Sequence, residues 1–227
     1  MSDTATDPAI DFDGSAYDLE FFLDPMCPFA WQTSRWIVRV AELRNLRIGW
    51  RFISLKVINE QNDAVSEDYK RGAAVGHGYL RILAAAREKL GNEAVGDLYT
   101  AWGERLWASP DVQKIFQGEN PVSAAVILAD LGLPEELAAE TDNEARDALL
   151  VAESNLAFER TGPDVGTPII TYGNGGNSLF GPVISSLPSD EDAVRIYDAL
   201  RVLVDFPAFS EVKRTKRPPL DLPAFRS

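Results

Sequence analysis

The chain has one cysteine, Cys27, in the stretch Asp-Pro-Met-Cys-Pro-Phe-Ala-Trp (residues 24–31), and its thiol is the group best suited to chemistry. The apolar run from Tyr17 to Leu23 before it predicts a buried strand. Pro28 suits the first turn of a helix, where the amide hydrogen that proline lacks has no partner. A helix N-terminus favours negative charge and can lower a cysteine pKa from about 8.5 to roughly 3.5–7.5. We therefore predict a reactive thiol, against the alternative of a small buried apolar side chain.

Ala30 occupies the position, three residues after Cys27, where thiol–disulfide enzymes have a second cysteine. A Cys-x-x-Cys pair would place its second thiol at residue 30, where this chain has Ala30. Because the chain has no other cysteine, no intramolecular disulfide can form. Dithiol exchange that ends in an internal disulfide is therefore excluded, whereas a mixed disulfide with another molecule is not.

Further candidate residues lie far along the chain. Thr167-Pro168 precedes the strand-like run TPIITYG (residues 167–173), and a proline at a strand start has a positional role. His77, the only histidine, could serve as a general acid or base, although a lone histidine is more often a polar loop residue. Trp31 and Trp107 could line a cleft for a flat or apolar substrate, although most tryptophans are core residues. One cysteine and one histidine make no metal-ligand cluster, so we expect no metal.

The net charge of −13 disfavours binding to nucleic acid and to anionic membranes. The one basic cluster, KRTKRPP (residues 213–219), is interpreted as a solvated helix end. Neither a signal peptide nor an apolar run of membrane-spanning length is visible, so we expect a cytoplasmic protein.

Apolar periodicity predicts the organisation of the chain. A strand, a helix to about Arg44 and a second strand (residues 46–55) form a β-α-β unit, and a mainly helical stretch follows. Two short strands and a helix from about Asp190 to Val204 end the pattern. We predict an α/β fold in which residues 16–62 and 162–214 form one discontinuous domain and residues 63–161 a helical insertion. Residues 1–15 are expected to be a disordered acidic tail, and residues 215–227 a C-terminal tail.

The sequence resembles the DsbA-like branch of the thioredoxin superfamily, and within it the group of mycothiol-dependent nitroreductases and oxidoreductases. Four segments carry the resemblance: DPMCPFAWQTSRWI (residues 24–37), DVGTPIIT (164–171), LFGPVISSLP (179–188) and FSEVKRTK (209–216). It implies a thioredoxin-like fold with an inserted all-helical domain. It also implies a cytoplasmic protein, often a homodimer, that uses a low-molecular-weight thiol such as mycothiol as cosubstrate and binds no cofactor tightly.

Carried over to this chain, the resemblance assigns roles to individual residues. Cys27 would be the nucleophile, Pro28 and Phe29 the motif spacers, and Thr167-Pro168 the cis-proline element beside the sulfur. Gly181 and Pro182 would fall in the segment after the last strand, where they and His77 are candidates for a substrate cleft between the core and the helical insertion.

Ala30 departs from the family pattern, because it stands where the family has its resolving cysteine. The first interpretation is a monothiol oxidoreductase whose mixed disulfide at Cys27 is released by a second small thiol. A second is a thiol-dependent transferase or isomerase of the kappa-class type. A third is a binding module without catalysis, which predicts an unreactive Cys27 with a normal or raised pKa.

Overall fold

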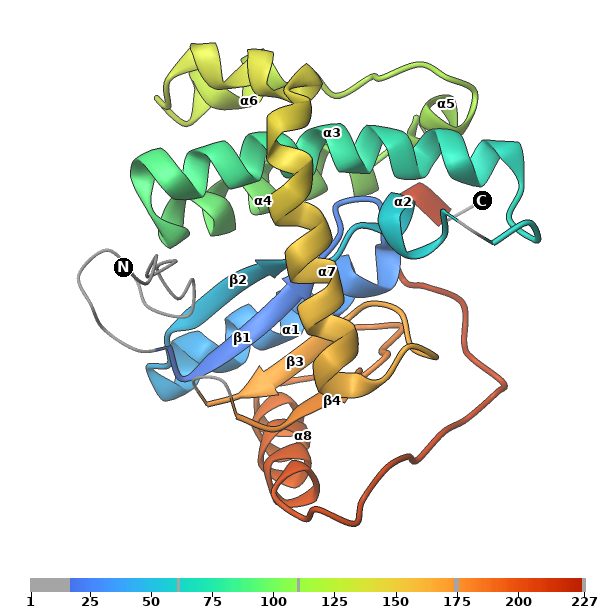
Figure 1. Ribbon diagram of the computed structural model, residues 1–227. Coiled ribbons are helices and arrows are strands. Elements are labelled where there is room, and N and C mark those ends of the chain that lie inside the picture. Colours follow the sequence, from blue (N-terminus) through green and yellow to red (C-terminus); the bar gives the residue numbers. More distant parts are fainter. Residues whose placement is uncertain (1–16, 61, 110, 174–175, 226–227) are drawn as a thin grey trace, which may run out of the picture.

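The computed structural model describes residues 17–60, 62–109, 111–173 and 176–225, so the expected tail of residues 1–15 lies outside the described residues. The chain forms a small sheet with helices on both sides of it and a group of helices beyond one edge (Figure 1). In chain order the elements are β1 (Leu19–Leu23), α1 (Pro28–Arg44), β2 (Ile48–Phe52), α2 (Leu55–Ile58), α3 (Glu67–Leu90), α4 (Asn92–Trp107), α5 (Val112–Phe116), α6 (Ala124–Asp130), the 3-10 helices η1 (Glu135–Asp142) and η2 (Glu144–Arg146), α7 (Asp147–Thr161), β3 (Ile169–Tyr172), β4 (Ser178–Phe180), α8 (Asp190–Val204) and η3 (Pro223–Phe225).

The sheet has four strands in the order β2-β1-β3-β4. β1 pairs in parallel with β2, with Leu19 opposite Ile48, and antiparallel with β3, with Leu19 opposite Tyr172. β4 pairs antiparallel with β3. All five residues of β1 are buried, as expected for a strand covered on both faces. This arrangement, with the helices α3 to α7 between β2 and β3, is a thioredoxin-like fold with a helical insertion, so the expected fold class is confirmed.

The helices α1 and α8 pack together against one face of the sheet. The indole Nε1 of Trp36 donates to the carbonyl oxygen of Ala193 at 3.1 Å, which joins the two helices. The helix α7 crosses the opposite face, in front of the sheet in Figure 1. Although α7 belongs to the stretch expected as a separate helical insertion, it also covers the core sheet.

A buried charge network fixes α7 to the sheet. Arg51 on β2 donates to Glu20 on β1 at 2.5 Å, and Arg160 on α7 donates to the other oxygen of Glu20 at 2.6 Å. Glu153, also on α7, accepts from the backbone amide of Phe52 at 2.8 Å. Since charges in an apolar interior must be paired, this network ties the sheet and α7 into one arrangement.

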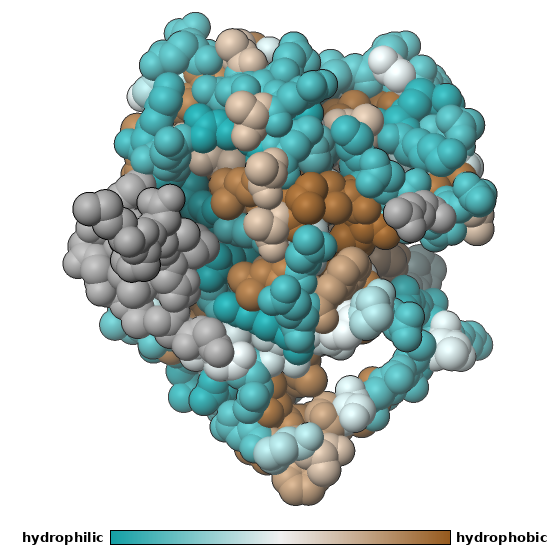
Figure 2. Space-filling model, viewed as in Figure 1, coloured by the Kyte–Doolittle hydropathy of each residue, from teal (hydrophilic) through white to brown (hydrophobic). Residues whose placement is uncertain are grey.

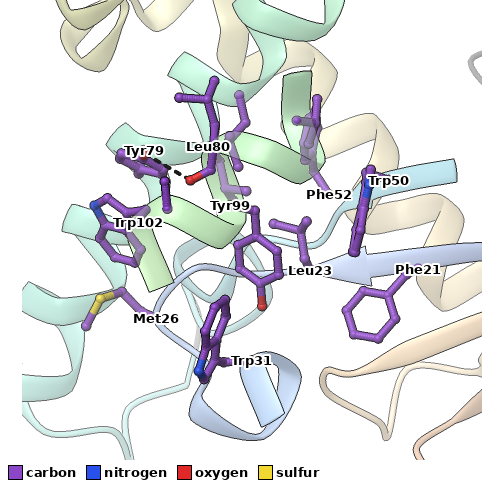
Figure 3. Close-up of a cluster of buried hydrophobic side chains, with 14 of the residues drawn as sticks. Phe21, Leu23, Met26, Trp31, Trp50, Phe52, Tyr79, Leu80, Tyr99 and Trp102 are labelled. Carbon is purple, nitrogen blue, oxygen red and sulfur yellow. Dashed lines mark hydrogen bonds between the residues drawn. The ribbon is translucent and has the colours of Figure 1, made fainter. Parts of the chain in front are cut away.

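Aromatic side chains fill the junction between the sheet and the helical insertion (Figure 3). Trp31 on α1 meets Tyr99 on α4 edge to face, with ring centroids 5.6 Å apart. A Cβ atom at Gly103 on α4 would lie 2.2 Å from the Trp31 ring, so only glycine leaves room for this indole. The beginning of α1 is therefore packed directly against the insertion.

Among the described residues, none of the helices combines the length and the apolar character needed to span a membrane.

Candidate functional site

Cys27 is the N-cap of α1. Its backbone is extended (φ −90°, ψ 108°), and its Sγ accepts a hydrogen bond from the backbone amide of Ala30 at 3.4 Å. The sulfur thus takes the place of the side-chain oxygen that usually caps a helix. Pro28 begins the helix, as predicted from the sequence. The local sequence therefore places a thiol on the unpaired amides of a helix N-terminus.

Thr167 lies against the same sulfur from the other half of the core. Sγ of Cys27 is 3.6 Å from the carbonyl oxygen of Thr167 and donates its hydrogen to it. The Thr167–Pro168 peptide bond is cis, and both residues are buried. The Thr167 hydroxyl donates to the carbonyl of Phe22 on β1 at 3.2 Å, which holds this segment beside the sheet.

The segment after β4 forms the next layer of the site. The amide of Gly181 donates to the carbonyl of Pro168 at 2.8 Å, and the hydroxyl of Thr33 on α1 donates to the carbonyl of Pro182 at 2.8 Å. Gly181 has a φ of +99°, a conformation that favours glycine. The structure thus places Gly181 and Pro182 beside the Thr167-Pro168 segment, which contacts the Cys27 sulfur.

The electrostatics of Cys27 differ from the sequence-based expectation. Burial, above all, raises the pKa of the Cys27 thiol to about 12, and the nearby charge of Asp24 raises it further. The amides of Ala30 and Phe29 act in the opposite direction but are outweighed. Only 8% of the residue surface is exposed. In the described state desolvation therefore opposes the stabilising effect of the helix N-terminus on the thiolate, and the reactivity of Cys27 stays a prediction.

Asp24 is a fully buried carboxyl group that the sequence analysis did not single out. Its two oxygens accept from the amides of Met26 and Leu55, each at 2.7 Å. Burial raises the pKa of Asp24 to about 7, against the effect of these two amides. The group therefore changes charge near neutral pH, next to the thiol. The available signal in the sequence was the position of Asp24, directly before Pro25 and three residues before Cys27.

The remaining motif residues lie between Cys27 and solvent or between α1 and the insertion. Pro28 and Phe29 are half-buried, and the guanidinium of Arg217 lies 5.4 Å from the centre of the Phe29 ring. Ala30 is fully buried, and Trp31 is covered by the guanidinium of Arg35, 4.1 Å from its ring. Sequence reasoning missed both arginine contacts.

His77 and Trp107 are not brought to the thiol. His77 lies within α3, not in a loop, and both of its ring nitrogens are engaged, Nδ1 with the Ser54 hydroxyl at 2.8 Å and Nε2 with Asp147 at 3.0 Å. Burial lowers the pKa of His77, which favours the neutral ring. Trp107 is 2% exposed and meets the ring of Phe225 at 6.0 Å. Both side chains belong to the packed interior.

Two surface hollows lie away from the motif. One, of about 480 Å³, is bounded by the end of α1, β2 and α4, and the other, of about 220 Å³, by α2 and α7. Neither is lined by a residue of the Cys27 motif. Within the described part of the chain, no group of three or more His, Cys, Asp or Glu side chains is arranged to hold a metal ion.

Comparisons with known proteins show what the chain is similar to. A model of the Rv2466c-like family, described as mycothiol-dependent nitroreductase Rv2466c, matches residues 26–214. The chain is 28% identical over 200 residues to Uncharacterized protein Rv2286c of Mycobacterium tuberculosis. The matched region spans 88% of this chain and 83% of that protein.

Two solved structures share the fold. The cytosolic disulfide reductase DsbM from Pseudomonas aeruginosa is similar with a TM-score of 0.52 and 17% identity, over 81% of this chain and 98% of that one. A 2-hydroxychromene-2-carboxylate isomerase is similar with a TM-score of 0.52 and 15% identity, over 82% of this chain and 95% of that one. At such identities these structures support the fold alone.

Proposed function

The chain belongs to the Rv2466c-like family, that of the mycothiol-dependent nitroreductase Rv2466c, and on this premise we propose that it is a thiol-dependent oxidoreductase with Cys27 as its single nucleophile. The observation that carries the proposal is the position of the Cys27 sulfur, between the backbone amide of Ala30 at the beginning of α1 and the carbonyl of Thr167. In this position an incoming sulfur can lie along the Thr167-Pro168 segment while it reacts.

The reaction we propose is monothiol exchange. Cys27 loses its proton to solvent and attacks one sulfur of a disulfide, whose S–S bond breaks as the leaving thiolate takes the electron pair. A second small thiolate then attacks the mixed disulfide at the sulfur of the bound small thiol and releases Cys27 as a thiolate. Ala30 has no sulfur for this second step, so the resolving thiol must come from solution. The family premise makes mycothiol the proposed small thiol.

Access is the condition for this reaction. The thiolate is disfavoured in the described state because burial raises the pKa of Cys27 to about 12. A substrate that exposes the sulfur removes the main cause of that shift, and the amides of Ala30 and Phe29 then favour the thiolate. We propose that substrate binding and activation of the thiol are coupled in this way.

The test is exchange with an oxidised small thiol, followed by intact mass. Incubation with mycothiol disulfide should add one mycothiol to each chain, and a second thiol should remove it. Cys27→Ser, which keeps the helix cap but has no sulfur, should gain no adduct. Absence of any adduct on the unmodified chain would contradict the proposal.

One observation favours a second candidate, a binding module without catalysis. A raised cysteine pKa, as burial produces here, is what an unreactive thiol would have. The mass experiment separates the two functions, because a binding module forms no adduct. A transferase or isomerase would instead form product from a thiol cofactor without net oxidation, which a balance of thiol and disulfide would detect.

We further propose, from the resemblance described in the sequence analysis, that the protein is cytoplasmic and forms a homodimer. Sedimentation velocity of the purified chain tests the dimer, which a mass of 25.0 kDa for the sedimenting species would exclude.

A further inference from the structure

The C-terminal segment returns to the Cys27 motif after leaving the fold. We call residues 205–225 the C-terminal strap. It leaves α8 at the bottom of the molecule and runs along one side (Figure 1), and it ends in η3, where Phe225 packs on Trp107 of α4. The basic cluster of residues 213–217 is therefore not a helix end, as the sequence suggested, because α8 ends at Val204.

The strap is held in place on the C-terminal side of the basic stretch. After it, the amide of Asp221 donates to the carbonyl of Ser185 at 2.7 Å, and the Ser185 hydroxyl donates to the carbonyl of Pro218 at 3.1 Å. Leu222 and Ala224 are buried in the main hydrophobic core. The strap thus has a defined position relative to the segment that follows β4.

The strap brings a positive charge, the guanidinium of Arg217, to the Cys27 motif. Arg217 stacks on the Phe29 ring, two residues from Cys27, and Figure 2 shows hydrophilic residues along much of the strap. Arg214, Lys216 and Arg217 are exposed, and among the described residues none of them forms a recorded ion pair. Glu211, the nearest acidic residue along the strap, pairs with Lys213 at 3.4 Å, and Asp221 on the other side is exposed and has a partner of its own. Of these cations, Arg217 is the one in contact with the motif, in a chain with a net charge of −13.

We propose that the C-terminal strap makes Cys27 selective, in its first attack, for anionic disulfides such as those that carry carboxylate groups; the small thiol of the second step need not be anionic. The proposal rests on the proposed function, in which Cys27 is the attacking sulfur. Cations within about 10 Å of a reacting group raise the local concentration of anions, and salt screens the effect. Arg217 also shields one face of Phe29, so an anion that binds it is held at the edge of the motif.

The test compares two aromatic disulfides that differ in charge. 5,5′-Dithiobis(2-nitrobenzoate) carries two carboxylates, whereas 4,4′-dithiodipyridine is neutral at pH 8, and both report reaction with Cys27 by absorbance. The measured quantity is the ratio of their second-order rate constants. In the triple variant Arg214→Gln/Lys216→Gln/Arg217→Gln this ratio should fall about three- to tenfold. On the unmodified chain the ratio should also fall as salt is added.

A matched control changes the same charge elsewhere. Arg44, Lys89 and Arg195 are cations at the far ends of α1 and α3 and on α8, and the triple variant Arg44→Gln/Lys89→Gln/Arg195→Gln should keep the ratio. An unchanged ratio in the strap variant, an equal fall in the control, or no salt dependence would overturn the selectivity while leaving Cys27 as the nucleophile. If neither disulfide reacts with Cys27, the proposed function itself fails, and the selectivity fails with it.

Discussion

The sulfur of Cys27 donates its hydrogen to the carbonyl oxygen of Thr167, 3.6 Å away, across 140 positions of sequence. This contact suits a protonated thiol, because a thiolate would face the carbonyl oxygen with no hydrogen between them. The amide of Ala30 on the other side of the sulfur suits a thiolate. The balance between these two neighbours and burial decides when the cysteine can react.

The first prediction concerns the pH dependence of the thiol. Because burial raises the pKa of Cys27 to about 12, its alkylation by iodoacetamide should accelerate steadily to at least pH 9 without a plateau. The rate is followed by intact mass at each pH, with urea-unfolded chain as the reference for a free thiol at about 8.5. A plateau below about pH 8 in the folded chain would mean that the helix N-terminus outweighs burial.

A second prediction concerns the missing resolving thiol. The side chain of Ala30 is fully buried and its amide touches the sulfur of Cys27, so Ala30→Cys places a second thiol within reach. After exposure to an oxidised small thiol, this variant should lose two hydrogens and keep no adduct. Intact mass distinguishes this product from the single adduct predicted for the unmodified chain.

Ala41→Cys is the matched control for that variant. It adds a thiol to the same helix, about 21 Å along the axis from Cys27, too far for a disulfide. This control should retain the adduct on Cys27. Retention of the adduct in Ala30→Cys as well would show that the beginning of α1 does not present the second position to the first.

Sequence reasoning succeeded where the determinants are local. The beginning of α1 at Pro28, its end at Arg44 and the whole of α8 follow from caps, proline and apolar spacing within a few residues. Burial of Cys27 depends instead on Thr167 and on packing that the local motif does not encode. The helix-terminus argument was sound for an exposed thiol and was outweighed here by desolvation.

The same distinction explains the candidate site residues. Cys27, Thr167, Pro168, Gly181 and Pro182 lie together because the strand order β1-β3-β4 brings their segments to one end of the sheet. His77 was a candidate acid, base or cleft residue, since nothing near it in sequence reveals its partners Ser54, before α2, and Asp147 on α7. The Arg217 contact was missed because the path of the strap is set by residues buried at its far end, Leu222 and Ala224.

Asp24 should make stability depend on pH between acid and neutral conditions. Burial raises its pKa from 3.8 to about 7 in the folded chain, so folding favours the neutral carboxyl. Its contribution is fully present below about pH 4 and is lost as the pH rises through about 7. Relative to Asp24→Asn, the unmodified chain should therefore lose free energy of unfolding across this range, measured by urea denaturation.

Asp190→Asn provides the opposite case for the same measurement. The guanidinium of Arg39 holds the pKa of Asp190 below its ordinary value of 3.8, so the contribution of this ion pair is present above about pH 4 and is lost only in more acid solution. The difference between this variant and the unmodified chain should stay constant from pH 5 to 8. A constant difference for Asp24→Asn too would show that the buried carboxyl does not titrate near neutrality.

Gly103 should be intolerant of any side chain. Its Cβ would collide with the Trp31 ring, which is held by Tyr99 edge to face at 5.6 Å and by the guanidinium of Arg35 at 4.1 Å. Gly103→Ala should lower the free energy of unfolding by about 1–3 kcal/mol in chemical denaturation, although alanine is the better helix former. Gly166→Ala, with no atom within 4 Å of the new methyl, should change it little. Equal effects would show that Trp31 yields easily.

His77 should matter for stability and not for exchange. Because Ser54 and Asp147 engage both of its ring nitrogens, neither is free to exchange a proton with Cys27. His77→Asn should lower the urea midpoint while the rate of reaction of Cys27 with 4,4′-dithiodipyridine stays the same under native conditions. A rate that falls together with a changed pH profile would instead give His77 a catalytic role.

The most direct test of the account is the release of a preformed mixed disulfide on Cys27. The adduct is prepared with an oxidised small thiol, freed of excess reagent, and followed by intact mass at increasing concentrations of a second thiol. With Ala30 beside the sulfur, the account predicts a release rate proportional to the second thiol and no release without it. Release at the same rate in its absence, or an adduct that no thiol removes, would contradict monothiol exchange at Cys27.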